Sequence, residues 1–255
     1  MKEQTLLAFD MSSFIWTHLS VGHDTENGYT VKHNDKDVYI NSHIYGFDNA
    51  MTRMIKLVEE FKLTPIDCIL VFEGANSKSK RLLINKDYKG GGGSSRPPEA
   101  YVEFEKMRDQ LRDTWKGLGA QTVAQDCAEG DDTLAYLADN TEVNLIVATF
   151  DNDLTVLNKV NKFGAKVSTW INQMFEHNKY GIFDYDLVTT YKALVGDSSD
   201  NIKGCVGFGV KAWDKLLAQY GEDGVREIHN MLQRSNLDPL ADFISGPADK
   251  LLQQI

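Results

Sequence analysis

The chain has 255 residues, of which 42% are hydrophobic, 25% charged and 10% aromatic. This composition excludes a protein that is disordered, collagen-like or a coiled coil as a whole, and the length is sufficient for a full hydrophobic core. Lysine and arginine together number 27 against 37 aspartate and glutamate residues, so the formal charge is −10, which by itself argues against a nucleic-acid partner.

The sequence gives no sign of export or of a membrane partner. No apolar run approaches the roughly 18 residues that a membrane helix needs, and Met1 to Gln4 lead directly into a strand-like run. We therefore expect a cytoplasmic protein. The three cysteines, Cys68, Cys127 and Cys205, are far apart and odd in number, which argues against a disulfide framework and a zinc motif. We expect them to be reduced and mostly buried.

Strand and helix patterns alternate along the chain. Strands are predicted, in chain order, at 5–9, 68–72, 121–125, 145–150 and 166–170. Helices are predicted at 44–61, 100–116, 131–139 and 183–195, and a mostly helical region follows residue 202. Three of the strands are continuous apolar runs, which is typical of strands buried on both faces of a parallel sheet. The alternation predicts an α/β fold with a mostly parallel central sheet flanked by helices.

Each of the three apolar strands is followed by an acidic residue, namely Asp10, Glu73 or Asp151. The carboxyl ends of parallel strands lie at the edge of a sheet where ligands bind, so these acids should lie close together. An acid after a strand can also cap the next helix or turn, and for any single one of them the two interpretations are about equally good. Three such acids together favour a cluster.

Further acids lie in motifs that would join this cluster. They are Glu129, Asp131, Asp132, Asp153, Asp197 and Asp200, which brings the total to nine acids. So many like charges are tolerated together only with cations. Carboxylates without His or Cys favour Mg²⁺, for which Mn²⁺ can substitute, over zinc, and nine acids suffice for two ions. Two ions about 3.5–4 Å apart are a standard arrangement for phosphodiester hydrolysis, so phosphoryl chemistry is the leading hypothesis.

An alternative is a phosphatase of the haloacid-dehalogenase type. Residues 150–156 fit the D-x-D-x-T motif of those enzymes, in which Asp151 would be a nucleophile and Asp153 a general acid. That motif normally begins the catalytic domain, whereas 150 residues precede Asp151 here. The alternative also leaves Asp10, Glu73 and Glu129 without a role, and it is therefore the weaker hypothesis.

Two other segments bear on phosphate binding. The first is basic and contains Lys78, Lys80, Arg81, Lys86 and Lys89, and it is followed by a run from Gly90 to Ser95 with the composition of a flexible linker. The second contains Gly204, Gly207, Gly209 and Lys211. Its glycines allow backbone amides to approach duplex phosphates closely, and the lysine adds a positive charge where the next helix starts.

Taken together, these motifs resemble the 5′-nuclease (flap endonuclease) superfamily, particularly phage 5′-3′ exonucleases and the 5′-nuclease domain of bacterial DNA polymerase I. The resemblance covers about residues 5–220 and rests on motifs at 7–10, 71–74, 128–132, 149–154 and 196–211. Each motif is weak alone, but their order and spacing make the combination specific. The resemblance implies a PIN-like nuclease domain at 1–200 with a helical arch at about 76–105, integrated with a helical helix-hairpin-helix region at 201–255.

The resemblance also implies roles for individual residues. Asp10, Glu73, Glu129 and Asp131 would surround a first metal ion and Asp151, Asp153, Asp197 and Asp200 a second, with Asp132 outside them. Arg81 and Lys89, eight residues apart and thus near one helical face, would face the scissile phosphate and stabilise the transition state. Lys78, Lys80, Lys86 and Tyr88 would assist in binding nucleic acid, and the helix-hairpin-helix would hold a K⁺ ion.

Two departures from the family pattern stand out. Glu73 occupies a position where many members have Asp, and residues 91–95 replace the Asn-Arg pair and basic residues usual in the arch. The second departure is expected to weaken the ordering of the arch and the binding of a 5′ flap.

The activity implied by the resemblance is that of a Mg²⁺-dependent, structure-specific 5′ nuclease. Its substrate would be branched, flapped or 5′-ended duplex DNA. The alternatives are an RNase H-type 5′-3′ nuclease that removes primers from RNA/DNA hybrids, and a catalytically weakened protein that binds DNA junctions. We expect a monomer that works with replication proteins in a bacterial or phage-infected cell.

Overall fold

The structure, a computed structural model, describes residues 4–20, 28–84, 86, 96–171, 174–175, 180, 187–198 and 201–234. The chain divides into two compact units. The first comprises residues 1–86 and 92–177, and the second comprises residues 87–91 and 178–255.

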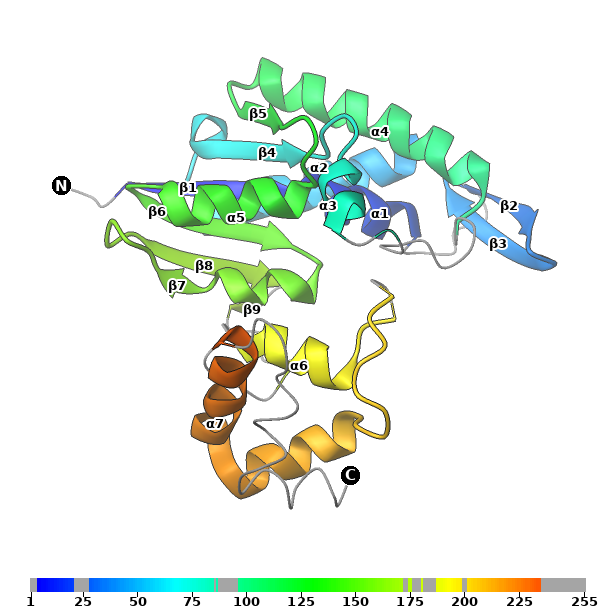
Figure 1. The fold of residues 1–255 in the computed structure, drawn as a ribbon. Coiled ribbons are helices and arrows are strands. Elements are labelled where there is room, and N and C mark those ends of the chain that lie inside the picture. Colours follow the sequence, from blue (N-terminus) through cyan, green and yellow to red (C-terminus); the bar gives the residue numbers. More distant parts are fainter. Residues whose placement is uncertain are drawn as a thin grey trace. The chain divides into compact units, whose positions relative to one another are not determined.

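In its described part, the first unit is built around a seven-stranded sheet (Figure 1). The spatial order is β5 (Gln121–Ala124), β4 (Cys68–Phe72), β1 (Thr5–Asp10), β6 (Asn144–Thr149), β8 (Lys166–Ile171) and β7 (Lys159–Val160), and β9 (Met174–Phe175) also pairs with β8. The first five of these strands run parallel, whereas β7 and β9 are antiparallel to β8. The prediction of a mostly parallel central sheet is confirmed.

Helices cover both faces of this sheet (Figure 1). They are α1 (Met11–Ser20), α2 (His43–Glu60), α4 (Pro98–Gly117) and α5 (Gly130–Asn140). Leu7 and Phe9 of β1 pack with α1, α2 and α4 on one face, whereas Ala8 packs with α5 on the other. Because both faces are covered, the strand is apolar at every inner position. Within the described ranges, no helix is long and apolar enough to cross a membrane.

Several elements were not predicted from the sequence. Helix α1 follows β1 without a connecting residue, so no turn signal separates the two. The hairpin of β2 (Gly28–His33) and β3 (Lys36–Asn41) turns at Asn34 and Asp35, whose φ angles are 51° and 60°. The sequence also did not predict α3 (Ser79–Ile84), the short strands β7 and β9, and the short 3₁₀ segments η1 (Pro65–Asp67) and η2 (Asn152–Leu157).

The expectation that the cysteines are mostly buried was wrong. All three are free thiols, but only Cys68 is buried, while Cys127 is half-buried and Cys205 is exposed. Cys68 lies on β4, which is paired on both sides by β5 and β1, whereas the other two cysteines lie in loops. The spacing of the cysteines excluded pairing but carried no information about burial.

In its described part, the second unit contains α6 (Val188–Val195) and α7 (Val210–Arg234), and α7 is kinked at Gly221. The loop between the two helices is closed by reciprocal backbone hydrogen bonds of 2.8 Å between Asp197 and Ile202. Gly204, with a φ of 68°, lies against the backbone of Gly196, and a Cβ atom at Gly204 would lie 2.6 Å from the Gly196 nitrogen. Two helices joined by a glycine-dependent loop are consistent with the predicted helix-hairpin-helix.

Candidate functional site

Three neighbouring strands bring acidic residues to one edge of the sheet. Asp10 is the last residue of β1, Glu73 follows β4 directly, and Asp151 comes two residues after the end of β6. Strands β4 and β6 are the parallel neighbours of β1 on its two sides. The charges of Asp151 and Glu73 both act on Asp10, so the three acids lie close together as the sequence predicted.

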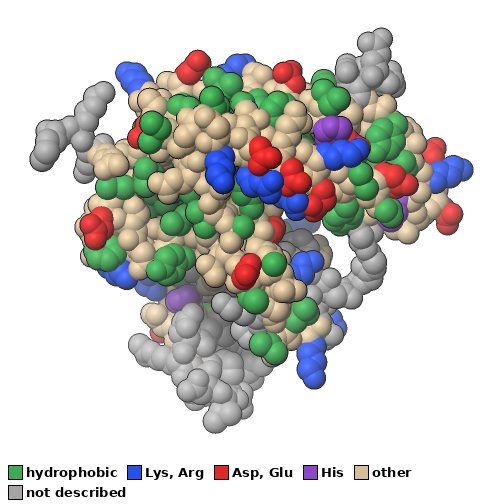
Figure 2. All heavy atoms as spheres, turned by 90° about the horizontal axis from the view of Figure 1, so that it is seen from above, with side chains coloured by type: hydrophobic (Ala, Val, Ile, Leu, Met, Phe, Trp, Pro, Cys, Tyr) green, Lys and Arg blue, Asp and Glu red, His purple; other side chains and the backbone are tan. Residues whose placement is uncertain are grey.

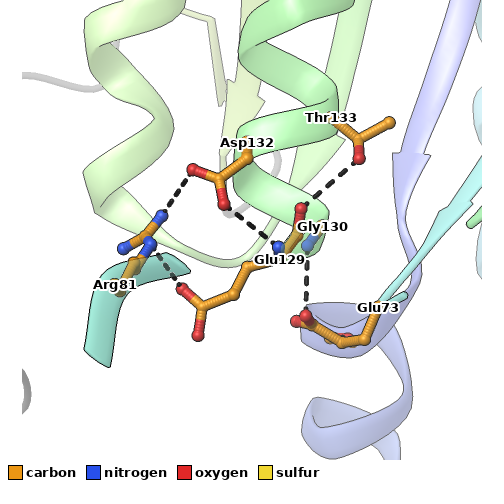
Figure 3. Close-up of polar contacts among 7 residues, drawn as sticks. Glu73, Arg81, Glu129, Gly130, Asp132 and Thr133 are labelled. Atoms are coloured by element: carbon orange, nitrogen blue, oxygen red, sulfur yellow. Dashed lines mark hydrogen bonds and ion pairs between the residues drawn. The ribbon is translucent and has the colours of Figure 1, made fainter. Parts of the chain in front are cut away.

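The loop after β4 brings a second acidic motif to the same place. The backbone nitrogen of Gly74 donates to the carbonyl of Ala128 at 3.2 Å. Glycine is required here because a Cβ atom would lie 1.7 Å from the carbonyl oxygen of Gln125. Helix α5 consequently starts beside Glu73, and the backbone nitrogen of Gly130 donates to Glu73 Oε2 at 3.2 Å (Figure 3).

Asp131, in the first turn of α5, shows the strongest effect of this crowding. Burial raises the pKa of its carboxyl from 3.8 to about 8, and the charges of Asp10, Asp151, Glu73 and Glu129 act in the same direction. Burial also raises the pKa of Asp10 to about 6. These five carboxyl groups therefore form one cluster, which we call the carboxylate cluster, and each of its charges disfavours the others.

The carboxylate cluster fits a hard divalent cation. All of its members offer carboxylate oxygens, and the raised pKa values of Asp10 and Asp131 show that full ionisation is unfavourable without added positive charge. Among the residues described, no three or more Asp, Glu, His or Cys side chains are grouped as they would be around a bound metal ion. An open set of carboxylates suits Mg²⁺, which keeps several of its water ligands.

Hydrogen bonds from neighbouring backbone and hydroxyl groups orient two of these acids. Asp10 accepts from the backbone nitrogen of Ser13 at 3.2 Å and from the hydroxyl of Thr149 at 2.7 Å. Asp151 accepts from the backbone nitrogen of Asp153 at 2.9 Å and caps η2. Asp10 and Asp151 thus cap the segments that follow them and are also members of the carboxylate cluster, so the two interpretations do not exclude each other.

Arg81 of α3 is a basic residue that contacts the carboxylate cluster. Its Nε lies 3.1 Å from Oε2 of Glu129, and its Nη2 lies 2.8 Å from Oδ1 of Asp132 (Figure 3). The Glu129 side chain is only 4% exposed, whereas that of Asp132 is 44% exposed. Asp132 also accepts from the backbone nitrogen of Glu129 at 3.0 Å. Asp132 therefore faces Arg81 and the helix start from the outer side of the motif.

Replacement of Arg81 by alanine is expected to lower the free energy of unfolding in a chelating buffer by about 1–3 kcal/mol, because the buried Glu129 loses this cation. Thermal unfolding at pH 7 in EDTA measures the change. Arg112→Ala is the matched control, since Arg112 lies 3.1 Å from exposed carboxylates of both Asp109 and Asp113. Its expected effect is below about 0.5 kcal/mol. Equal losses in the two variants would contradict the importance of the Glu129 pair.

The surface of α4 carries charges of both signs. Arg108 and Arg112 pair with Asp109 at 2.9 and 3.1 Å. In the upper part of Figure 2, Lys and Arg side chains likewise lie beside Asp and Glu side chains. Proteins that bind nucleic acid usually carry a surface patch on which Lys and Arg are clustered, and this surface of mixed charge differs from such a patch.

Part of the predicted basic stretch can be placed. Lys78 and Lys86 are exposed, whereas the side chain of Lys80 and all of Tyr88 and Lys89 lie outside the described residues. Helix α3 ends at Ile84 and Lys86 lies in a turn. The prediction that Arg81 and Lys89 share one helical face assumed a continuous helix between them, and the helix does not continue to Lys86.

The remaining predicted residues belong to the second unit. Asp197 pairs with Nζ of Lys192 at 2.8 Å, and both side chains are less than one fifth exposed. Asp200 lies outside the described residues, so metal binding by either acid stays a prediction. Gly207, with a φ of 80°, forms a turn closed by a 3.0 Å hydrogen bond from the nitrogen of Phe208 to the carbonyl of Cys205.

Sequence reasoning missed the hydroxyl groups around the carboxylate cluster. Thr149 and Ser13 contact Asp10 or its neighbours, and the hydroxyl of Ser12 donates to Oε1 of Glu73 at 3.3 Å. The sequence signal that could have identified them is their position: Thr149 is the last residue of an apolar strand, and Ser12 and Ser13 follow the end of another within three residues.

Comparison with known proteins identifies relatives of the chain, although no family model matches it. The 5′-3′ exonuclease of Bacillus subtilis is 31% identical over 184 residues, which are 69% of this chain and 59% of that protein. DNA polymerase I of Bacillus caldotenax is 30% identical over 198 residues, or 74% of this chain and 21% of the polymerase. The chain thus spans about a fifth of the polymerases that it matches.

Solved structures share the fold. A bacteriophage T5 5′-exonuclease with bound divalent metal ions (zinc) matches with a TM-score of 0.61, at 18% identity, over 98% of this chain and 87% of that one. The T5 flap endonuclease, in a pseudo-enzyme-product complex with DNA and metal ions, gives a TM-score of 0.59 at 17% identity over 98% and 86% of the two chains.

The chain is thus similar to proteins of the 5′-nuclease superfamily. This confirms the resemblance that five motifs suggested, and the predicted PIN-like α/β fold is confirmed with it. The carboxylate cluster of the chain draws on four of those motifs, those that contain Asp10, Glu73, Glu129 with Asp131, and Asp151.

Proposed function

We propose that the chain is a divalent-metal-dependent, structure-specific 5′ nuclease. It would cleave DNA phosphodiesters near junctions of single strand and duplex, leaving a 5′-phosphate and a 3′-hydroxyl. The observation that carries this proposal is the carboxylate cluster, in which burial and like charges raise the pKa of Asp131 to about 8. The proposal is supported by relatives named 5′-3′ exonuclease and by the T5 structures titled with metal ions and DNA.

The proposed ligands follow from the carboxylate cluster and the family motifs. Asp10, Glu73, Glu129 and Asp131 would hold one Mg²⁺, and Asp151, Asp153, Asp197 and Asp200 would hold a second, with Asp132 outside them. Mn²⁺ would substitute for Mg²⁺, and K⁺ is proposed at residues 204–211. Two such ions would supply Lewis-acid chemistry there: they would lower the pKa of an attacking water and stabilise negative charge on the attacking and leaving oxygens of the phosphodiester.

Arg81 has a proposed role of its own. Its planar guanidinium, now held by Glu129 and Asp132, has the shape that also grips a phosphate in a bidentate manner. We propose that it exchanges these carboxylates for the scissile phosphate and, together with Lys89, stabilises negative charge there.

Duplex binding is proposed for the loop that precedes α7. Gly207, Gly209 and Lys211 are exposed, so backbone amides and one positive charge are available to phosphates without contacting bases. Gly204 shapes this loop, while Lys78, Lys80, Lys86 and Tyr88 would contact DNA near the carboxylate cluster. A monomeric state, replication proteins as partners and a cytoplasmic location stay predictions.

The test is cleavage of a 5′-flap DNA in Mg²⁺ compared with EDTA. Wild-type protein is expected to cleave only with the metal, and Asp153→Ala, which lacks a proposed metal ligand, is expected to cleave about 10³-fold more slowly while it still binds the flap. Unchanged cleavage by Asp153→Ala would contradict the two-metal assignment.

The same assay separates the alternatives. Metal-dependent binding without cleavage would indicate a DNA-junction binding protein, and preference for an RNA/DNA hybrid would indicate a primer-removing nuclease. Hydrolysis of small phosphomonoesters would favour the haloacid-dehalogenase-type phosphatase.

A further inference from the structure

Thr149 is a buried threonine that lies between two acids of the carboxylate cluster. It is the last residue of β6 and is only 2% exposed. Its Oγ1 lies 2.7 Å from Oδ2 of Asp10 and 2.9 Å from the backbone nitrogen of Asp151. The N–H group can only donate and an ionised carboxylate can only accept. The hydroxyl therefore accepts from Asp151 and donates its own hydrogen to Asp10.

Ser13 of α1 braces this arrangement from the other side. Its backbone nitrogen donates to Oδ1 of Asp10 at 3.2 Å, so both oxygens of that carboxylate are hydrogen-bonded. Its hydroxyl oxygen accepts from the backbone nitrogen of Phe150 at 2.6 Å and lies 3.3 Å from Oγ1 of Thr149. The backbone between Thr149 and Asp151 is thus held from the first turn of α1.

The position of Thr149 in the sheet explains why a side chain is needed. The parallel pairing of β1 with β6 extends to Phe9 and Ala148, one residue before Asp10 and Thr149. Beyond that point no backbone pairing between β1 and β6 holds the two strands together, and the hydroxyl of Thr149 connects Asp10 to Asp151 instead. Threonine is also restricted at χ1 by its branched Cβ, which favours one direction for the hydroxyl.

We propose that Thr149 is a positioning residue for divalent cations, because it sets the carboxylate of Asp10 and the backbone of Asp151 in one fixed relation. The inference rests on the proposed function, in which Asp10 and Asp151 bind different metal ions. A rotation of Asp10 would then displace the Asp151 loop, so the hydroxyl links the two halves of the carboxylate cluster. Hydrogen-bond partners of metal ligands typically contribute 10–100-fold to metal affinity or activity.

The test is Mn²⁺ binding to the full chain, measured by isothermal titration calorimetry and by electron paramagnetic resonance of free Mn²⁺. Two matched comparisons isolate the hydroxyl: wild type against Thr149→Val, and Thr149→Ser against Thr149→Ala. In each comparison the protein without the hydroxyl is expected to bind Mn²⁺ about 10–100-fold more weakly. Affinities within twofold in both comparisons would overturn the proposal, and the Ser/Ala comparison decides if the valine variant does not fold.

Thr169→Val is the control for loss of a buried hydroxyl. Thr169 is fully buried on β8, and its Oγ1 accepts from Nδ2 of Asn158 at 2.6 Å. This variant is expected to melt at a lower temperature in EDTA but to bind Mn²⁺ like wild type. An equal loss of Mn²⁺ affinity in Thr169→Val would show a general effect of stability and overturn the positioning role.

The outcomes also separate this inference from the proposed nuclease. If wild type cleaves no flap DNA but binds Mn²⁺ more tightly than Thr149→Val, the positioning role is supported and the nuclease is rejected. If wild type cleaves flap DNA but Thr149→Val binds Mn²⁺ as tightly as wild type, the nuclease is supported and the positioning role is rejected.

Discussion

Asp131→Asn is expected to abolish metal-dependent cleavage while making the metal-free protein more stable. Asparagine keeps the size of the side chain but removes a charge on which Asp10, Asp151, Glu73 and Glu129 act unfavourably. Loss of a metal ligand that supports several kcal/mol of transition-state stabilisation lowers the rate by about 10³-fold or more. Activity and stability should therefore move in opposite directions.

The stability effect follows from the raised pKa of Asp131. At pH 7 the folded protein must either ionise this carboxyl in an unfavourable place or hold a proton that the unfolded chain does not bind, and both cost free energy. The variant avoids that cost, so its free energy of unfolding in EDTA is expected to rise, on the order of 2 kcal/mol. Calorimetric melting in EDTA and flap cleavage in Mg²⁺ measure the two effects.

Asp139→Asn provides the matched control on the same helix. Asp139 pairs with Lys159 at the surface, and its side chain is 55% exposed. Its replacement is expected to leave cleavage unchanged and to alter stability by less than about 1 kcal/mol. The prediction fails if Asp131→Asn melts below wild type in EDTA, or if it cleaves within tenfold of the wild-type rate.

The metal-free protein is expected to lose stability as the pH rises from about 4 to about 8. The pKa of Asp10 is raised to about 6 and that of Asp131 to about 8, so in this range the folded state binds more protons than the unfolded state. Stability falls with pH wherever the folded state binds the extra protons. The expected loss is on the order of 3 kcal/mol.

Other groups act with the opposite sign at the acid end of this range. Burial acts to raise the pKa of Glu103, but hydrogen bonds from His43 and Lys106 outweigh it and lower that pKa overall. The contribution of Glu103 is therefore present above pH 4.5 and is lost as the pH falls. Burial lowers the pKa of His18 below 6.5, so its contribution is likewise lost on acidification. The difference between wild type and Asp131→Asn isolates the contribution of Asp131, because both proteins share the contributions of Glu103 and His18.

The measurement is denaturant unfolding at several pH values, with EDTA or with Mg²⁺. Mg²⁺ is expected to restore stability at pH 8, where the carboxylate cluster is most highly charged, and to have little effect at pH 4. A metal-free stability that is flat or rises between pH 6 and pH 8 would contradict the electrostatic description of Asp10 and Asp131.

Three acids of the carboxylate cluster, Asp10, Glu73 and Asp151, could be predicted from the sequence because one geometric rule places them. Parallel strands end at a common edge, so residues at or just after the ends of β1, β4 and β6 must converge whatever the details of packing. The short apolar runs also located the strands within one or two residues. Those inferences needed only local pattern and general topology.

The contacts that organise the carboxylate cluster could not be obtained in this way. Arg81 lies 48 residues before Glu129, and Thr149 lies 139 residues after Asp10. Their pairing depends on where α3 and α5 begin and on the register of β1 against β6. Basic residues and threonines are common, so the spacing alone did not mark these two as partners of particular carboxylates.

The close approach at Gly74 limits how the spacing of this site can change. Main-chain atoms join the loop after β4 to the loop before α5, so repacking of side chains cannot adjust the separation of the two loops. The reach of the carboxylate at position 73 can then change only with the length of its side chain. Glutamate at this position reaches both Gly130 and Ser12. Glu73 has one methylene more than the Asp usual in the family, and this extra length lets its carboxylate span a distance that the backbone fixes.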